Sequence, residues 1–326
     1  MGEPQVLIIL GCGRSGTTIL GETLGKHPAL ANWYEPYFIW DWHVGIPGNS
    51  VRRAEDLTPK ARDIVRREFR LYAANSGKPW VIDKSPEHCF TIPFVHAAFP
   101  NAKWIHVIRD GRDVIASLFR EWVKREAIAR NLDIRGFAAV VREMLELQPF
   151  WRNRFQAVLF ELKTNLSPDP RKYFNKSKWR GKNGFGARFS EWELGFDELP
   201  TYAFNARQWV ESERAIRENK GCIPVSNFRT IRYEDFLSDP VGEIGSLLNF
   251  LDLETDAIEE MVAQVWNANS GSWKCQFDAD MLRRIADIAN PTLKELGYIQ
   301  EANWWYRSNK ASSRKPGAVG TLRPTR

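Results

Sequence analysis

The chain has 326 residues, enough for one large α/β domain or two small ones, and its 43% hydrophobic and 26% charged residues are typical of a globular protein. No run approaches the roughly 20 apolar residues of a membrane-spanning helix, so we expect no membrane span. Residues 307–326 carry six Lys or Arg and no acid, so they account for the whole net charge of +6 and the rest of the chain is close to neutral. We therefore predict a single domain over residues 1–306, a disordered basic tail over 307–326, and no nucleic-acid partner.

The four cysteines lie far apart and show no metal-ligand spacing; they are Cys12, Cys89, Cys222 and Cys275. This pattern predicts reduced thiols and no bound metal. The N-terminus shows no basic segment followed by an apolar stretch and a small-residue cleavage site, so we expect a cytoplasmic location.

Short apolar runs bounded by turns predict four strands, at Val6–Leu10, Trp80–Ile82, Lys103–Ile108 and Thr230–Arg232. Helical spacing occurs between and after them, at Ile19–Leu24, Pro59–Tyr72, Val114–Arg125, Phe137–Leu147, Val241–Leu251, Ala257–Val265 and Met281–Leu296. Strands that alternate with helices predict an α/β fold with a phosphate-loop-type parallel sheet flanked by helices.

Residues from about 131 to 218 interrupt this alternation and are rich in tryptophan, with Trp151, Trp179, Trp192 and Trp209. We interpret them as a mostly helical insertion in which acceptor specificity would lie. Within it, the segment Pro170–Ser190 carries seven Lys or Arg and no acid, which suits either solvated surface or an anionic ligand.

The strongest single signal is Gly11–Thr18 (GCGRSGTT), which follows a predicted strand and opens a predicted helix. A glycine loop in this position wraps a phosphate in backbone N–H groups at a helix N-terminus. In the nucleotide-triphosphatase pattern G-x-x-x-x-G-K-[ST], a lysine would stand where Thr17 stands here, and that lysine reaches the outer phosphates. Its absence argues against a kinase or ATPase, while Arg14 keeps the loop cationic.

Four ordered groups of residues spanning 6–298 resemble the motifs of sulfotransferases that use 3′-phosphoadenosine-5′-phosphosulfate (PAPS). The resemblance is closest to tyrosylprotein sulfotransferases and related bacterial sulfotransferases. The groups are Arg14–Thr18 followed by His27-Pro28 and Glu35; Asp83–Pro86 followed by Phe99–Lys103 and Val107–Ser117; Arg232–Asp235; and Ser270–Lys274 followed by Leu296–Tyr298.

The resemblance implies a site and a reaction. Glu35 would be the general base, and Arg14 and Lys84 would flank the transferring sulfuryl group. The residues implied to bind PAPS, and its product adenosine-3′,5′-bisphosphate, are Gly13, Arg14, Ser15, Gly16, Thr17, Thr18, Arg109, Ser117, Tyr233, Ser270 and Ser272. No metal is implied.

Charge and position support this assignment independently. PAPS carries phosphates at two separated positions, so its site needs two anion cradles. The glycine loop supplies one, and Arg109 at the end of a predicted buried strand can supply the other, because ligands of parallel sheets lie at the carboxyl ends of the strands. Ser117, eight residues further on, can add a hydroxyl.

Several alternatives stay open. A small-molecule kinase on the same fold, or a non-catalytic nucleotide-binding protein, would share the glycine loop. His88 is a rival base, although an ordinary helix histidine is the simpler interpretation. The acceptor hydroxyl could belong to a glycan, a peptide tyrosine, or a small alcohol or phenol, and the oligomeric state is not fixed by the sequence.

Overall fold

The computed structural model describes residues 2–41, 48–130, 150–166, 178–179, 182–265 and 271–306. Its elements are, in chain order, β1 (Gln5–Leu10), α1 (Thr17–Gly25), β2 (Leu30–Tyr34), α2 (Tyr37–Asp41), α3 (Pro59–Ser76), β3 (Trp80–Lys84), the short 3-10 helix η2 (Pro86–Phe90), α4 (Ile92–Ala98), β4 (Lys103–Ile108), α5 (Gly111–Arg130), α7 (Trp151–Leu166), β5 (Lys178–Trp179), β6 (Lys182–Asn183), α8 (Thr201–Asn219), β7 (Phe228–Arg232), α9 (Tyr233–Ser238), α10 (Pro240–Phe250), α11 (Ile258–Val262), α12 (Trp273–Gln276) and α13 (Ala279–Glu295).

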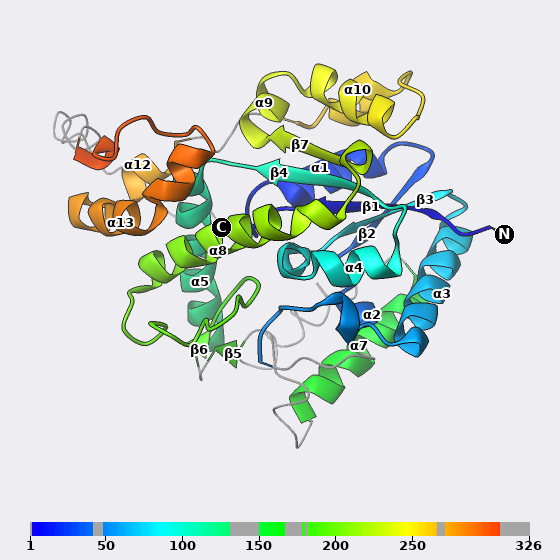
Figure 1. The fold of residues 1–326 in the computed structure, drawn as a ribbon, viewed down its shortest axis with the longest axis horizontal. Coiled ribbons are helices and arrows are strands. Elements are labelled where there is room, and N and C mark those ends of the chain that lie inside the picture. Colours follow the sequence, from blue (N-terminus) through cyan, green and yellow to red (C-terminus); the bar gives the residue numbers. More distant parts are fainter. Residues whose placement is uncertain are drawn as a thin grey trace, which may run out of the picture.

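Five of these strands form one parallel sheet in the order β2-β3-β1-β4-β7 (Figure 1). The apolar alternation of β1 explains how the sheet is covered. Leu7 and Ile9 pack against α1 and the helices α9 to α11, whereas Ile8 packs on the opposite face against α3, α4 and α8. The three inner strands, β1, β3 and β4, are therefore buried on both faces, as their continuous apolar runs require.

This architecture confirms the predicted α/β class with a parallel sheet flanked by helices. All four predicted strands lie within observed ones. The fifth, β2, was not predicted, because the segment Leu30–Tyr34 (LANWY) is short, lacks β-branched residues and lies at the edge of the sheet.

The predicted insertion is described only in part. The helix expected over Phe137–Leu147, the tail over 307–326 and residues 170–177 of the basic segment lie outside the described residues. The described part forms α7, the two-stranded β5–β6 hairpin and α8, and α8 packs along α5 and α13 (Figure 1). Among the described helices, none combines the length and the apolar character that crossing a membrane requires.

Candidate functional site

The carboxyl ends of all five strands meet at one edge of the sheet, and each is followed by residues of the predicted site. The loop Gly11–Gly16 follows β1, Glu35 follows β2, Lys84 ends β3, Arg109 follows β4 and Tyr233 follows β7. The register of the parallel strands places these ends next to one another: Tyr34 is paired with Lys84, and Ile108 with Arg232. The topology therefore brings together residues that are up to 222 positions apart in the chain.

The loop after β1 has the shape of an anion cradle. Gly16, at its end, has a left-handed backbone with φ 98°, and a Cβ placed there would lie 2.2 Å from Cδ2 of Tyr233. Helix α1 then starts with no side-chain cap and no acid in its first turn, so its positive end faces the loop. The hydroxyl of Ser15 is fully buried and has no hydrogen-bond partner among the described residues, so it can bond a phosphate oxygen held in the loop.

Arginines surround this loop. Nε of Arg14 donates to Oγ of Ser117 at 3.1 Å, and Nη1 of Arg109 donates to the carbonyl of Arg14 at 2.9 Å. Arg109 is buried, and its guanidinium lies 4.4 Å from the ring centroid of Tyr233. Burial, together with the charges of Arg109 and Arg14, lowers the pKa of Arg120 on the same helix as Ser117. Three cations thus gather where an anionic ligand would bind.

Glu35 and Lys84 form a close ion pair, with Oε1 and Nζ 2.6 Å apart. The Lys84 side chain is 2% exposed and that of Glu35 31%, so the lysine is enclosed while the carboxylate still faces solvent. The structure thus pairs Lys84 with Glu35 rather than with Asp83 or Glu87. Glu35 has φ 42° and Arg14 φ 76°, so two of the four non-glycine residues with left-handed backbones in the described chain belong to this site. Such strained conformations occur preferentially at functional positions.

The remaining groups of residues also converge here. Glu234 accepts hydrogen bonds from the backbone N–H of Asp110 and from the hydroxyl of Tyr298, both at 2.9 Å. The pKa of Tyr298 is raised by burial and by the charge of Glu234, so its hydroxyl stays protonated and donates.

Asp113 holds residues 271–273, part of the last group of matching residues, in place. Its carboxylate accepts from the backbone N–H groups of Gly271 (2.7 Å) and Trp273 (3.3 Å) and from the hydroxyl of Ser272 (3.1 Å). The single hydroxyl proton of Ser272 is therefore already donated, and a hydrogen bond from it to a phosphate would require this bond to break. Ser270, the other serine predicted to bind PAPS, lies outside the described residues.

His88 is not an ordinary helix histidine. It lies in η2, is buried, and both ring nitrogens are engaged, Nε2 with Asp83 and Nδ1 with Thr91, each at 3.0 Å. Asp83 is fully buried and also accepts from Nε1 of Trp40 and from the hydroxyl of Ser85. Successive strand residues point to opposite faces, so Asp83 and His88 lie across β3 from Lys84.

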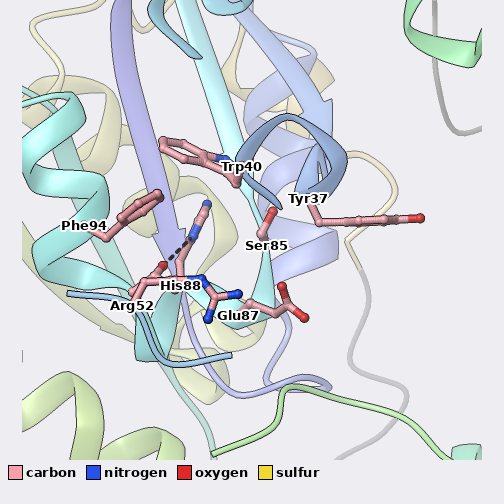
Figure 2. A pocket seen from close by; sticks show the side chains of 8 residues that line it. Tyr37, Trp40, Arg52, Ser85, Glu87, His88 and Phe94 are labelled. Atoms are coloured by element: carbon pink, nitrogen blue, oxygen red, sulfur yellow. Dashed lines mark hydrogen bonds between the residues drawn. The ribbon is translucent and has the colours of Figure 1, made fainter. Parts of the chain in front are cut away.

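A small pocket opens on this second face, next to the buried network. Figure 2 shows the ring of Trp40 and the ring of Phe94 on one side, with the polar groups of Arg52, Glu87 and Ser85 opposite. The figure also shows the hydrogen bond between His88 and Thr91, which links two lining residues. The pocket is close to the site in sequence, because Ser85 directly follows Lys84.

Sequence reasoning missed two contributors. Asp113 was given no role within Val107–Ser117, because its contacts to residues 271–273 span about 160 positions and no local pattern reveals them. Tyr34 was given no role either. Its pairing with Lys84 depends on β2, which was not predicted. Within the described residues, no group of three or more His, Cys, Asp or Glu side chains has the arrangement of a metal site.

Comparison with known proteins gives a match to one family model. Residues 4–163 match the model described as the sulfotransferase family. Among curated proteins, the nodulation protein NoeE of Sinorhizobium fredii (strain NBRC 101917 / NGR234) is 29% identical over 134 residues, which are 36% of this chain and 32% of that protein. A putative protein-tyrosine sulfotransferase of Caenorhabditis briggsae is 23% identical over 305 residues, which are 90% of this chain and 89% of that protein. The chain thus spans about a third of the length of NoeE.

Solved structures with a similar trace include a sulfotransferase from Alicyclobacillus acidocaldarius, at 16% identity and a TM-score of 0.49, covering 94% of this chain and all of that one. A sulfotransferase domain from the curacin biosynthetic pathway matches at 15% identity and a TM-score of 0.47, covering 96% of this chain and 98% of that one.

Proposed function

Because the chain belongs to the sulfotransferase family by its match over residues 4–163, we propose that it transfers the sulfuryl group of PAPS to an acceptor hydroxyl. The observation that carries the proposal is the meeting, at one sheet edge, of an anion cradle, a group of arginines and the Glu35–Lys84 pair. A ligand with two separated phosphates and a transferable sulfuryl group matches this distribution of charge.

The donor would be held by residues that follow three strands, β1, β4 and β7. The N–H groups and hydroxyls of residues 13–18 would bind the 5′-phosphosulfate, and Arg109 and Ser117 the 3′-phosphate. Arg14 links the two, since its side chain reaches Ser117 while its carbonyl accepts from Arg109. Tyr233 would lie against the nucleoside, with its ring already supporting Arg109.

In-line transfer leaves three tasks to the protein. Glu35 accepts the proton of the acceptor hydroxyl as the new S–O bond forms. The bond from sulfur to the bridging oxygen breaks, and its electron pair stays on the 5′-phosphate, whose charge Arg14 and the loop N–H groups stabilise. Once Glu35 is neutral, its Coulomb attraction for Lys84 falls, so the ammonium that flanks the bridging oxygen can donate a hydrogen bond to it as it departs.

The acceptor class is proposed more broadly, as a hydroxyl on a peptide tyrosine, a glycan, or a small alcohol or phenol. The similarity to a putative protein-tyrosine sulfotransferase along nearly its whole length makes a tyrosine peptide the first acceptor to try. We also propose a reducing compartment such as the cytoplasm, supported by four free cysteines of which two are buried.

The test is calorimetric titration with adenosine-3′,5′-bisphosphate, AMP and ATP with magnesium. The bisphosphate should bind most tightly. Arg109→Ala should weaken it about 10- to 150-fold, the equivalent of about 1.5–3 kcal/mol for hydrogen bonds to a charged group, while AMP changes much less. The matched control is Arg217→Ala, since Arg217 forms an exposed ion pair with Glu295 and is not among the proposed binding residues. Tighter binding of ATP, or no binding of any nucleotide, would refute the proposal and favour the kinase or the non-catalytic alternative.

A further inference from the structure

Tyr34, the last residue of β2, contacts three parts of the site at once. It lies beside Lys84 in the register of β2 and β3, and the ammonium of Lys84 is 4.0 Å from the centroid of its ring. Its hydroxyl lies close enough to the side chain of Thr18, in the first turn of α1, to interact with it. The next residue in the chain is Glu35. Tyr34 therefore links the proposed base, the cation and the donor loop.

The environment of Lys84 explains why such a link matters. Its side chain is 2% exposed, so water does little to solvate the ammonium, and its carboxylate partner is one oxygen of Glu35 at 2.6 Å. The lysine side chain is a flexible four-carbon stem, so an ammonium held only by one carboxylate would move with that carboxylate. The face of an aromatic ring attracts a desolvated cation strongly and supplies a second, fixed contact.

The ring itself is firmly placed. Trp33, its neighbour in β2, is fully buried and stacks on Tyr72 of α3 with ring centroids 4.2 Å apart, which anchors the end of the strand. Tyr34 is half-buried on the other face of β2, towards α1. Burial, followed by the charge of Glu35, raises the pKa of Tyr34 to about 12, so the phenol is neutral near pH 7 and does not itself act as a base.

We propose that Tyr34 is a positioning residue for sulfuryl transfer: its ring fixes the ammonium of Lys84 beside Glu35, and its hydroxyl ties that ring to Thr18 of the donor loop. The inference rests on the proposed function. It adds that the base–cation pair and the donor cradle keep a fixed spacing because one side chain contacts both. Tyr34→Phe keeps the ring and loses the tie to Thr18, whereas Tyr34→Leu loses both.

The kinetic test compares these variants in sulfuryl transfer. Tyr34→Leu should lower kcat about 10-fold or more, with less than 3-fold change in the KM for PAPS, because the cation–π contact is lost. Tyr34→Phe should restore kcat to within about 3-fold of the wild type. In a Lys84→Met background, Tyr34→Leu should have no further effect on kcat, since the group it positions is gone. Tyr72→Leu is the control: it removes the buried tyrosine of α3 that stacks on Trp33, and it should lower the melting temperature without this kinetic pattern.

A second measurement needs no activity. The ring current of Tyr34 should shift the Lys84 side-chain methylene signals upfield in NMR spectra, and this shift should persist in Tyr34→Phe and vanish in Tyr34→Leu. Equal shifts in the two variants, or a fall in kcat that is the same with and without Lys84, would overturn the proposal. If the wild type bound no adenosine-3′,5′-bisphosphate, the proposed function would fail instead, and the NMR comparison would still decide whether Tyr34 holds Lys84.

Discussion

Replacement of Gly16 by alanine tests the coupling between the phosphate loop and Tyr233. A Cβ at Gly16 would lie 2.2 Å from Cδ2 and 2.5 Å from Cε2 of the Tyr233 ring, whereas ordinary contact begins at 3.4 Å. The ring would have to retreat by about 1 Å, and the guanidinium of Arg109 lies over that ring at 4.4 Å. Displacement of Tyr233 therefore reaches the residue proposed to bind the 3′-phosphate.

The expected cost has two parts. The backbone at Gly16 has φ 98°, and a residue with a Cβ in a left-handed conformation costs about 1–2 kcal/mol. Overpacking against the ring adds about 1–3 kcal/mol. A total of about 2–5 kcal/mol corresponds to a fall in melting temperature of roughly 4–10 °C for a domain of this size. Affinity for adenosine-3′,5′-bisphosphate should fall about 10-fold or more, because Arg109 moves.

Gly77→Ala is the matched control. Gly77 ends α3 with φ 66°, and a Cβ there would meet no atom within 4 Å, so it carries the backbone cost without the clash. Its variant should lose about 1–2 kcal/mol and bind the bisphosphate normally. Thermal unfolding and calorimetry on both variants separate the two contributions. If Gly16→Ala were no less stable than Gly77→Ala and bound the bisphosphate as well as the wild type, the coupling of loop and ring would be wrong.

Three further predictions follow from other contacts. Glu35→Gln should lower kcat about 10²–10⁴-fold in a sulfuryl-transfer assay, with donor affinity by calorimetry nearly unchanged, because it removes the proposed base and leaves the cradle intact. Burial raises the pKa of Glu68, but hydrogen bonding and charge from Arg152 outweigh it and lower this pKa overall. The ionised carboxylate therefore stabilises the fold at pH values above its unfolded-state pKa. This stabilisation is lost as the pH falls through the lower pKa of the folded state. Glu68→Gln should therefore be less stable than the wild type near pH 7, and this difference should shrink in denaturation curves recorded below about pH 4. A thiol reagent should label the two exposed cysteines rapidly and the two buried ones only on unfolding; the exposed ones are Cys222 and Cys275, and the buried ones Cys12 and Cys89.

Local patterns sufficed to predict the core strands and the glycine loop after β1. The run Val6–Leu10 followed by Gly11–Thr18 requires only neighbouring residues to be interpreted, because continuous apolar residues predict a buried parallel strand and glycines predict the turn. Arg109 was predicted by the same reasoning, as a cation at the end of an apolar run. In the structure Arg109 follows β4 and donates to the carbonyl of Arg14, while its contact with a ligand stays a prediction.

Such local patterns could not predict contacts between residues that are far apart in the sequence. Glu35 and Lys84 are 49 positions apart, and their 2.6 Å contact depends on the pairing of β2 with β3. Since β2 was not predicted, the contact could be expected only from resemblance, and the part of Tyr34 in it could not be expected at all. Asp113 is a similar case, because a carboxylate in the first turn of a helix predicts a local cap and not a bond to Gly271.

At the end of β3 the fold separates two buried charges that are adjacent in the sequence. Asp83 and Lys84 are consecutive, of opposite charge, and both buried, yet they face opposite sides of the sheet. Asp83 is satisfied on one side by Trp40, Ser85 and His88, while Lys84 lies on the other between Glu35 and Tyr34, on the side of α1. Because an unpaired buried charge is costly, each set of partners is needed to hold its charge in place. The imidazole of His88 thus stabilises the strand end on the face opposite Lys84, and the carboxylate on the face of Lys84 is Glu35, the proposed base.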